Sequence, residues 1–394
     1  MIPPYYTFQI PIKIVSGQKA LESVPEEMGQ LGTCRPMVLT TPELVRTGAV
    51  STVLEAFRHS DLNIDEIYQI VPKKPTAKLI RDLANSFVEQ EYDGLLAIGG
   101  GTVIHTGKYL EQRLTGEGPS LLPSGAPLGG GIPLRIPFIA IPALPGSGPE
   151  APCAVFAPAE ELKGDKEPLS AACLPDLVVV DGRLSRPLSP LHTAASAMDT
   201  LSHAIDAYTA PDNNPMRNGY ALSAILLVRD HLRRAVRHAG DKEARLGLAN
   251  GAMLASVASA HAPQGLTRNV AQCLGWLCNI PQTMAESVLL PHCMEYEMPR
   301  KEEAYAELLL PLAGSEIYSD TDRQDRGRKT VYYIKNLVRT YQDICGLPTG
   351  LAQLDVKRSA FGAIAEGAAR RLASQSWTYD RVQEDVFNIL NLAY

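Results

Sequence analysis

The sequence lacks several features that mark large classes of proteins. None of its seven cysteines forms a CxxC pair, and an odd, scattered set is typical of reduced thiols rather than of a disulfide framework or a zinc site. No stretch approaches the roughly 18 consecutive apolar residues of a membrane span. The first six residues have neither the charged nor the apolar part of a signal peptide. We therefore expect a cytoplasmic protein with no membrane partner.

A clustered basic surface is also missing. The chain has 37 Lys and Arg against 43 Asp and Glu, which gives a formal net charge of −6 at pH 7. Basic residues gather only in short groups such as Arg233-Arg234 and Arg370-Arg371, which most simply lie on solvated helix faces. Nucleic-acid binding needs a concentrated positive face, so no nucleic-acid partner is expected.

The length of 394 residues is too great for one hydrophobic core and indicates more than one domain. Strand-like runs alternate with helix-like runs up to about residue 181, and the strands are continuously apolar. The strand-like runs are residues 12–16, 36–40, 67–71, 94–98, 136–142 and 177–181, and the helix-like runs are 53–59, 77–90 and 103–112. This alternation is typical of a parallel sheet covered on both faces.

The character of the sequence changes after Asp181. Segments rich in Ala and Leu follow, punctuated by prolines, and no strand pattern returns. The sequence thus predicts an α/β nucleotide-binding domain with a largely parallel sheet over residues 1–183, and an all-helical domain over residues 184–394.

Three glycines and a threonine, Gly99, Gly100, Gly101 and Thr102, follow a buried strand and precede a helix. Glycines let the backbone come close to a phosphate, and a helix N-terminus offers N–H groups and a positive dipole. Ligands of open α/β sheets bind at this edge. The turn therefore predicts a nucleotide site, and the alternative is a tight turn that binds nothing.

Two further segments carry candidate chemistry. Gly146, Ser147 and Gly148 follow the next strand and form either a second loop under a dinucleotide or a plain turn. Asp199 and His203 lie four residues apart in a helical segment, so their side chains share one face. They can hold a divalent ion, although for two residues alone an ordinary hydrogen-bonded pair is the favoured interpretation.

These segments, in this order, resemble the iron-containing (group III) alcohol dehydrogenases, whose fold is like that of dehydroquinate synthase. The similarity extends over nearly the whole chain, in residues 12–17, 97–104, 139–142, 146–148, 174–181, 197–208, 214–216, 288–292 and 389–394. It implies hydride transfer between NAD(P) and a small alcohol or aldehyde, and a homodimer or larger assembly. It also implies a divalent ion held by one Asp and three His, of which Asp199 and His203 match the first two ligands.

The other two ligands of the family pattern are absent. The family pattern GLxHxxAHxLG reads GLTRNVAQCLG here, and the following PHG reads PQT. Arg268 and Gln282 therefore replace the third and fourth ligands, and Gln272 replaces a further histidine. A guanidinium has no lone pair to offer a metal, and an amide oxygen is a poor partner for zinc or iron. We expect no tight metal, and an ion pair between Arg268 and Asp199 in its place; the alternative is that Arg268 turns to solvent and a loose ion binds.

The coenzyme half departs from the family as well. Thr41 stands where the family has an acidic residue that meets the adenosine ribose, and its lack of charge permits a 2′-phosphate. NADP is therefore slightly favoured over NAD. The predicted nucleotide contacts are Thr41, Gly99, Gly100, Gly101, Thr102 and Ser147.

Two functions are compatible with these residues. The first is an NAD(P)-dependent alcohol dehydrogenase or aldehyde reductase that works without the standard metal, with Arg268 and Gln272 as the candidate catalytic residues. The second is a catalytically inactive member that binds nucleotide or assembles with an active relative. The number of altered positions supports the second more than a single change would.

Overall fold

The computed structural model describes residues 5–70, 76–115, 135–143, 146, 174–373 and 381–394. The chain divides into two compact units. An α/β unit runs from Ile10 to Pro187, and a helical unit runs from Leu188 to Tyr394. Residues 5–9 and Gly146 belong to the helical unit, although they precede it in the sequence.

The α/β unit is built on one parallel sheet with the strand order β1-β6-β5-β4-β2-β3. Its strands are β1 (Lys13–Ser16), β2 (Pro36–Thr40), β3 (Ile67–Gln69), β4 (Gly94–Gly99), β5 (Phe138–Pro142) and β6 (Leu177–Val180). Each recorded pairing is parallel, so the carboxyl ends of the strands meet at one edge. β2, β4 and β6 are buried along their whole length, as expected for strands covered on both faces.

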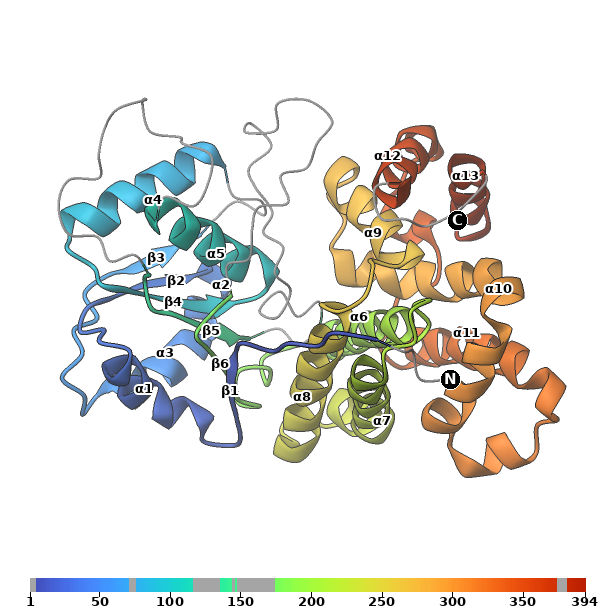
Figure 1. The fold of residues 1–394 in the computed structure, drawn as a ribbon, viewed down its shortest axis with the longest axis horizontal. Coiled ribbons are helices and arrows are strands. Elements are labelled where there is room, and N and C mark those ends of the chain that lie inside the picture. The colour runs from blue at the N-terminus through green and yellow to red at the C-terminus, as the bar shows by residue number, and fades with distance from the viewer. Residues whose placement is uncertain (1–4, 71–75, 116–134, 144–145, 147–173, 374–380) are drawn as a thin grey trace. The chain divides into compact units, whose positions relative to one another are not determined.

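Helices cover both faces of this sheet: α4 and α5 lie on one face, and α1 and α3 on the other (Figure 1). The helices are α1 (Val24–Gln30), α2 (Pro42–Arg46), α3 (Ala49–Leu54), α4 (Ala77–Glu89) and α5 (Gly101–Thr115), with short 3-10 segments η1 (Ala20–Ser23) and η2 (Glu55–Phe57). Apolar side chains of η1, α1 and α3 pack with those of the central strands in one core. The predicted α/β class is confirmed, and β2 has the predicted bounds.

The second unit is helical throughout its described residues. It contains α6 (Pro190–Tyr208), α7 (Pro215–Arg237), α8 (Lys242–Ser259), α9 (Leu266–Leu277), α10 (Gln282–Ser319), α11 (Arg326–Cys345), α12 (Phe361–Ala373) and α13 (Val382–Leu392), with 3-10 segments η4 (Arg323–Asp325), η5 (Leu351–Leu354) and η6 (Arg358–Ala360). Side-chain caps start several helices: Ser189, Asn214 and Asp241 accept hydrogen bonds from backbone N–H groups of α6, α7 and α8. The predicted all-helical class of this half is also confirmed.

Helix α6 lies at the centre of this unit and contacts α7, α8, α9, α10 and α11. Nearly all of its residues from Thr193 to Ala207 are buried, so any polar side chain on it needs a partner inside the protein. α10 passes beside α6 and is interrupted at Lys301 and Gly314, where the backbone leaves the helical conformation. Asp199, His203 and Asp206 are thereby held inside the helical core.

No helix in the described ranges combines the length and the apolarity needed to cross a lipid bilayer.

Candidate functional site

The glycine turn lies at the carboxyl edge of the sheet, between β4 and α5. α5 starts at Gly101, and the carbonyl of Gly100 accepts hydrogen bonds from the N–H groups of Val103 and Ile104 at 3.1 and 3.2 Å. A Cβ on Gly99 would lie 2.6 Å from Cγ2 of Val103, so the strand returns into the helix too tightly for a side chain. The turn therefore presents backbone at a helix N-terminus, which suits an anion such as a pyrophosphate.

Thr41 lies at the same edge, since β2 pairs with β4 in the register Leu39 to Ala97. It is the N-cap of α2, and its side chain accepts a hydrogen bond from the N–H of Leu44 at 3.4 Å. Thr102 follows Gly101 in the first turn of α5. Ser147 lies outside the described residues. The structure thus gathers the other predicted nucleotide contacts at one edge of the sheet, and their role in binding stays a prediction.

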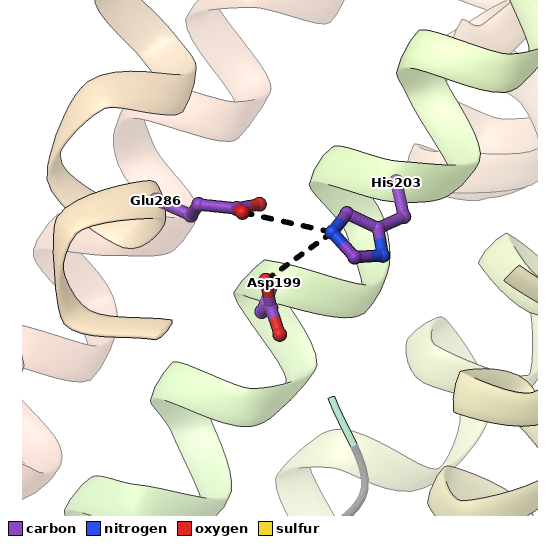
Figure 2. Close-up of side chains that lie close together, drawn as sticks. All are labelled: Asp199, His203 and Glu286. Carbon is purple, nitrogen blue, oxygen red and sulfur yellow. Dashed lines mark ion pairs between the residues drawn. The ribbon is translucent and has the colours of Figure 1, made fainter. Parts of the chain in front are cut away.

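In the helical unit, Asp199 and His203 on α6 converge with Glu286 on α10 (Figure 2). Nε2 of His203 lies 3.5 Å from Oδ1 of Asp199 and 3.6 Å from Oε1 of Glu286. One donor atom from each side chain falls within 4.8 Å of the other two, and all three residues are buried. We call these three residues the acidic–imidazole cluster.

Burial dominates the electrostatics of the cluster. It raises the pKa of Asp199 well above its usual range, and the neighbouring Glu286 carboxylate raises it further. Burial lowers the pKa of His203, and the positive charge of Arg268 lowers it again, so the imidazole is neutral near pH 7. Burial alone would raise the pKa of Glu286, but its interactions with the His203 imidazole and with the Arg268 guanidinium outweigh burial and lower that pKa. Burial and the charge of Glu286 thus oppose ionisation of Asp199, and a bound cation would favour it.

Gln282 and the backbone at Gly146 lie beside the two carboxylates. Gln282 donates a hydrogen bond from Nε2 to Oε1 of Glu286 at 2.7 Å, one turn earlier on α10. The backbone at Gly146 passes so near Asp199 that a Cβ there would lie 2.9 Å from Oδ2. Gln282, at the family's fourth ligand position, is therefore a partner of Glu286.

The expected ion pair between Arg268 and Asp199 is wrong. Nη1 of Arg268 donates a hydrogen bond to Oγ of Ser259 at 3.0 Å, and no ion pair joins Arg268 to Asp199 among the described residues. The expectation treated Asp199 as an isolated carboxylate, whereas it shares its surroundings with Glu286. Arg268 is nevertheless only 6% exposed, so the alternative in which it turns to solvent is wrong as well.

Gln272, the other predicted catalytic residue, lies on α9. Its Oε1 accepts a hydrogen bond from Nη2 of Arg371 on α12, and the same guanidinium donates from Nε to Oδ1 of Asn269 at 3.2 Å. These contacts join α9 to α12. A catalytic role for Gln272 stays a prediction.

The acidic–imidazole cluster fits the divalent ion that the fold family implies, although not through the family's one-Asp, three-His set. Both carboxylate oxygens of Asp199 and both ring nitrogens of His203 are buried without a hydrogen-bond partner in the described structure, and so is Oε2 of Glu286. Carboxylate and imidazole are ordinary ligands of first-row divalent ions. Sequence reasoning missed Glu286, although an acidic residue inside the apolar run from Met284 to Leu290 is a visible signal that it has a buried partner.

Comparison with known proteins agrees with this architecture. Residues 11–182 match the family model described as iron-containing alcohol dehydrogenase, and residues 193–394 match the C-terminal model of the Fe-containing alcohol dehydrogenase family. The chain is 28% identical to a choline dehydrogenase of Bacillus subtilis over 77% of its own length and 76% of that protein. It is 26% identical to an NADPH-dependent butanol dehydrogenase of Clostridium saccharobutylicum over 90% and 88% of the two chains.

A solved structure of 1,3-propanediol oxidoreductase superposes with a TM-score of 0.85 at 25% identity, covering 99% of this chain and all of that one. Models of a single family thus match both halves of the chain. The chain belongs to the iron-containing alcohol dehydrogenase family.

Proposed function

We propose that the chain transfers hydride between NAD(P) and a small alcohol or aldehyde, without the one-Asp, three-His ion of its family. The observation that carries the proposal is the pairing, in one chain, of a glycine turn at the sheet edge with the buried acidic–imidazole cluster. Relatives named for choline, butanol and 1,3-propanediol support a small alcohol as the substrate. The homodimer or larger assembly and the cytoplasmic location expected from the sequence stay predictions.

Reduction of a carbonyl places negative charge on its oxygen, so the site needs positive charge or a proton donor there. Arg268 supplies a fixed positive charge that already acts on His203 and Glu286. Its Nε is buried with no hydrogen-bond partner in the described structure, so it has a donor to offer a substrate oxygen that enters the site. A divalent ion held by the cluster would add positive charge for the same oxygen.

The preference for NADH or NADPH tests whether Thr41, at the edge of the sheet, contacts the adenosine ribose of the coenzyme. With Thr41 directly after β2, no carboxylate at that position repels a 2′-phosphate, and NADPH is expected to bind at least as well as NADH. Thr41→Asp keeps an N-cap on α2, because Asp caps helices as well as Thr does. The added charge should shift the ratio of Kd values towards NADH by about tenfold or more.

The matched control is Thr47→Asp, which adds the same charge at the other end of α2 and should leave the ratio unchanged. Fluorescence titration with both nucleotides measures the effect. A strong native preference for NADH, or an equal shift in both variants, would contradict the assignment of Thr41.

One observation favours the second function, an inactive member that binds nucleotide. Both glutamines that replace family histidines have structural partners, Gln272 with Arg371 and Gln282 with Glu286. The two functions are separated by measuring NADH and NADPH binding together with coenzyme oxidation across a panel of short aldehydes. Hydride transfer predicts both binding and turnover, whereas binding without turnover on any aldehyde would support the inactive member.

A further inference from the structure

The acidic–imidazole cluster is an unusual concentration of unsatisfied polar atoms. Asp199, His203 and Glu286 are at most 1% exposed, yet five of their side-chain polar atoms have no hydrogen-bond partner in the part of the chain that the structure describes. A buried polar group without a partner costs roughly 1–3 kcal/mol, and a charged one costs more. Such a cost is sustained in a folded core when something outside the polypeptide satisfies the group.

The spacing of the cluster matches a shared ion better than a hydrogen-bond network. The separations of 3.5 and 3.6 Å from Nε2 of His203 to the two carboxylates exceed the usual N–H···O length of about 2.9 Å. Ligands placed about 2.1 Å from a tetrahedral ion lie about 3.4 Å from one another. The distances from Nε2 of His203 to the two carboxylates are therefore close to those between neighbouring ligands of one ion.

The charges of the cluster also call for a cation. Two carboxylates, Asp199 and Glu286, stand together in a buried site, and like charges there repel strongly. The nearby cation, Arg268, is bonded to Ser259 and makes no ion pair with either carboxylate among the described residues. A divalent ion bound between them would neutralise both.

We propose that Asp199, His203 and Glu286 bind one divalent first-row metal ion, with Gln282 as the positioning residue that orients Glu286. Glu286 thereby supplies one ligand in place of the imidazoles that the family has at positions 268 and 282. Because a carboxylate replaces imidazoles among the ligands, the metal preference of the site should shift from zinc and iron towards Mn²⁺. The hydrogen bond from Gln282 fixes the direction of the Glu286 carboxylate, as groups around metal ligands commonly do.

This inference does not rest on the proposed function, because metal binding is measured without coenzyme or substrate. Full-length protein is stripped with EDTA, dialysed, and titrated with Mn²⁺, which is followed by calorimetry and by electron paramagnetic resonance. Wild type is expected to bind one Mn²⁺ per chain. Zn²⁺ in a second titration is expected to compete with Mn²⁺ for the same site.

Glu286→Gln is nearly isosteric and removes one ligand charge, so it should weaken Mn²⁺ binding by about a hundredfold or more. Gln282→Ala should weaken it by roughly 10- to 100-fold, the range found for groups that support a metal ligand. The matched control is Glu303→Gln, an exposed site on the same helix, which should bind as wild type does. Circular dichroism and thermal unfolding check that each variant is folded.

A spectroscopic signature keeps the test decisive even if Glu286→Gln fails to fold. Pulsed resonance on the Mn²⁺ form of wild type should show coupling to an imidazole nitrogen, and His203→Gln should lose it. Absence of stoichiometric Mn²⁺ and Zn²⁺ binding to wild type would overturn the proposal, because the carboxyl pair would then be satisfied by a shared proton. Equal affinity in wild type and Glu286→Gln would overturn it too.

Discussion

Gly100→Val is expected to raise the Kd for NADH and NADPH by about a hundredfold or more while leaving the fold intact. Gly100 sits between β4 and α5, where the backbone offers its N–H groups at a helix N-terminus. A β-branched side chain there would hold a pyrophosphate away from the backbone. Each charge-assisted hydrogen bond lost costs about 1.5–3 kcal/mol, so two such bonds account for the factor.

The fold should survive because Gly100 is not among the described residues with positive φ. Gly29→Val is the matched control: Gly29 is exposed on α1, and a Cβ there meets nothing within 4 Å. Fluorescence titration of both variants, with circular dichroism as the check on folding, measures the effect. Undiminished affinity in Gly100→Val would place the nucleotide elsewhere.

Gly265→Ala is expected to destabilise the protein by about 3 kcal/mol and to lower its Tm by roughly 5–10 °C. Gly265 is the N-cap of α9, and a Cβ there would lie 2.0 Å from Oδ2 of Asp206. Asp206 is buried within α6, so its carboxyl can move away from the added Cβ only by displacing packed neighbours. Burial raises the pKa of Asp206 to about 8, so its carboxyl is largely protonated at neutral pH.

Gly219→Ala is expected to have the opposite effect on the free energy of unfolding. Gly219 is exposed within α7, and a Cβ there meets nothing within 4 Å, so alanine should stabilise the helix by about 0.5–1 kcal/mol. Thermal unfolding of both variants measures the difference. If Gly265→Ala were as stable as Gly219→Ala, the close packing of α9 on Asp206 would be contradicted.

The sheet could be predicted largely from the sequence, because its buried strands are continuous apolar runs that end in turn residues. β2 and β4 were found within one residue, whereas α1 and α2 were missed. α1 and α2 span seven and five residues, too few for an apolar period of 3.6 to show. Local pattern therefore located the strands that carry the glycine turn.

The cluster could be predicted only in part. Asp199 and His203 lie on one helix, and their spacing of four residues was sufficient to pair them. Glu286 comes from α10, more than eighty residues away in the sequence, and only the packing of α10 on α6 brings it to them. The expectation that Arg268 pairs with Asp199 was wrong, because it rested only on the position of Arg268 in the family pattern. The guanidinium instead bonds to Ser259, the last residue of α8, which the pattern does not place.

Hydride transfer itself is tested most directly with NADPH that carries deuterium at the transferred position. The protein is incubated with this coenzyme and a panel of short aldehydes, and the alcohols formed are examined by mass spectrometry. Deuterium is expected on the carbinol carbon of at least one alcohol, and Gly100→Val should abolish its transfer. Intact binding of NADPH with no deuterium in any alcohol would contradict the proposed function.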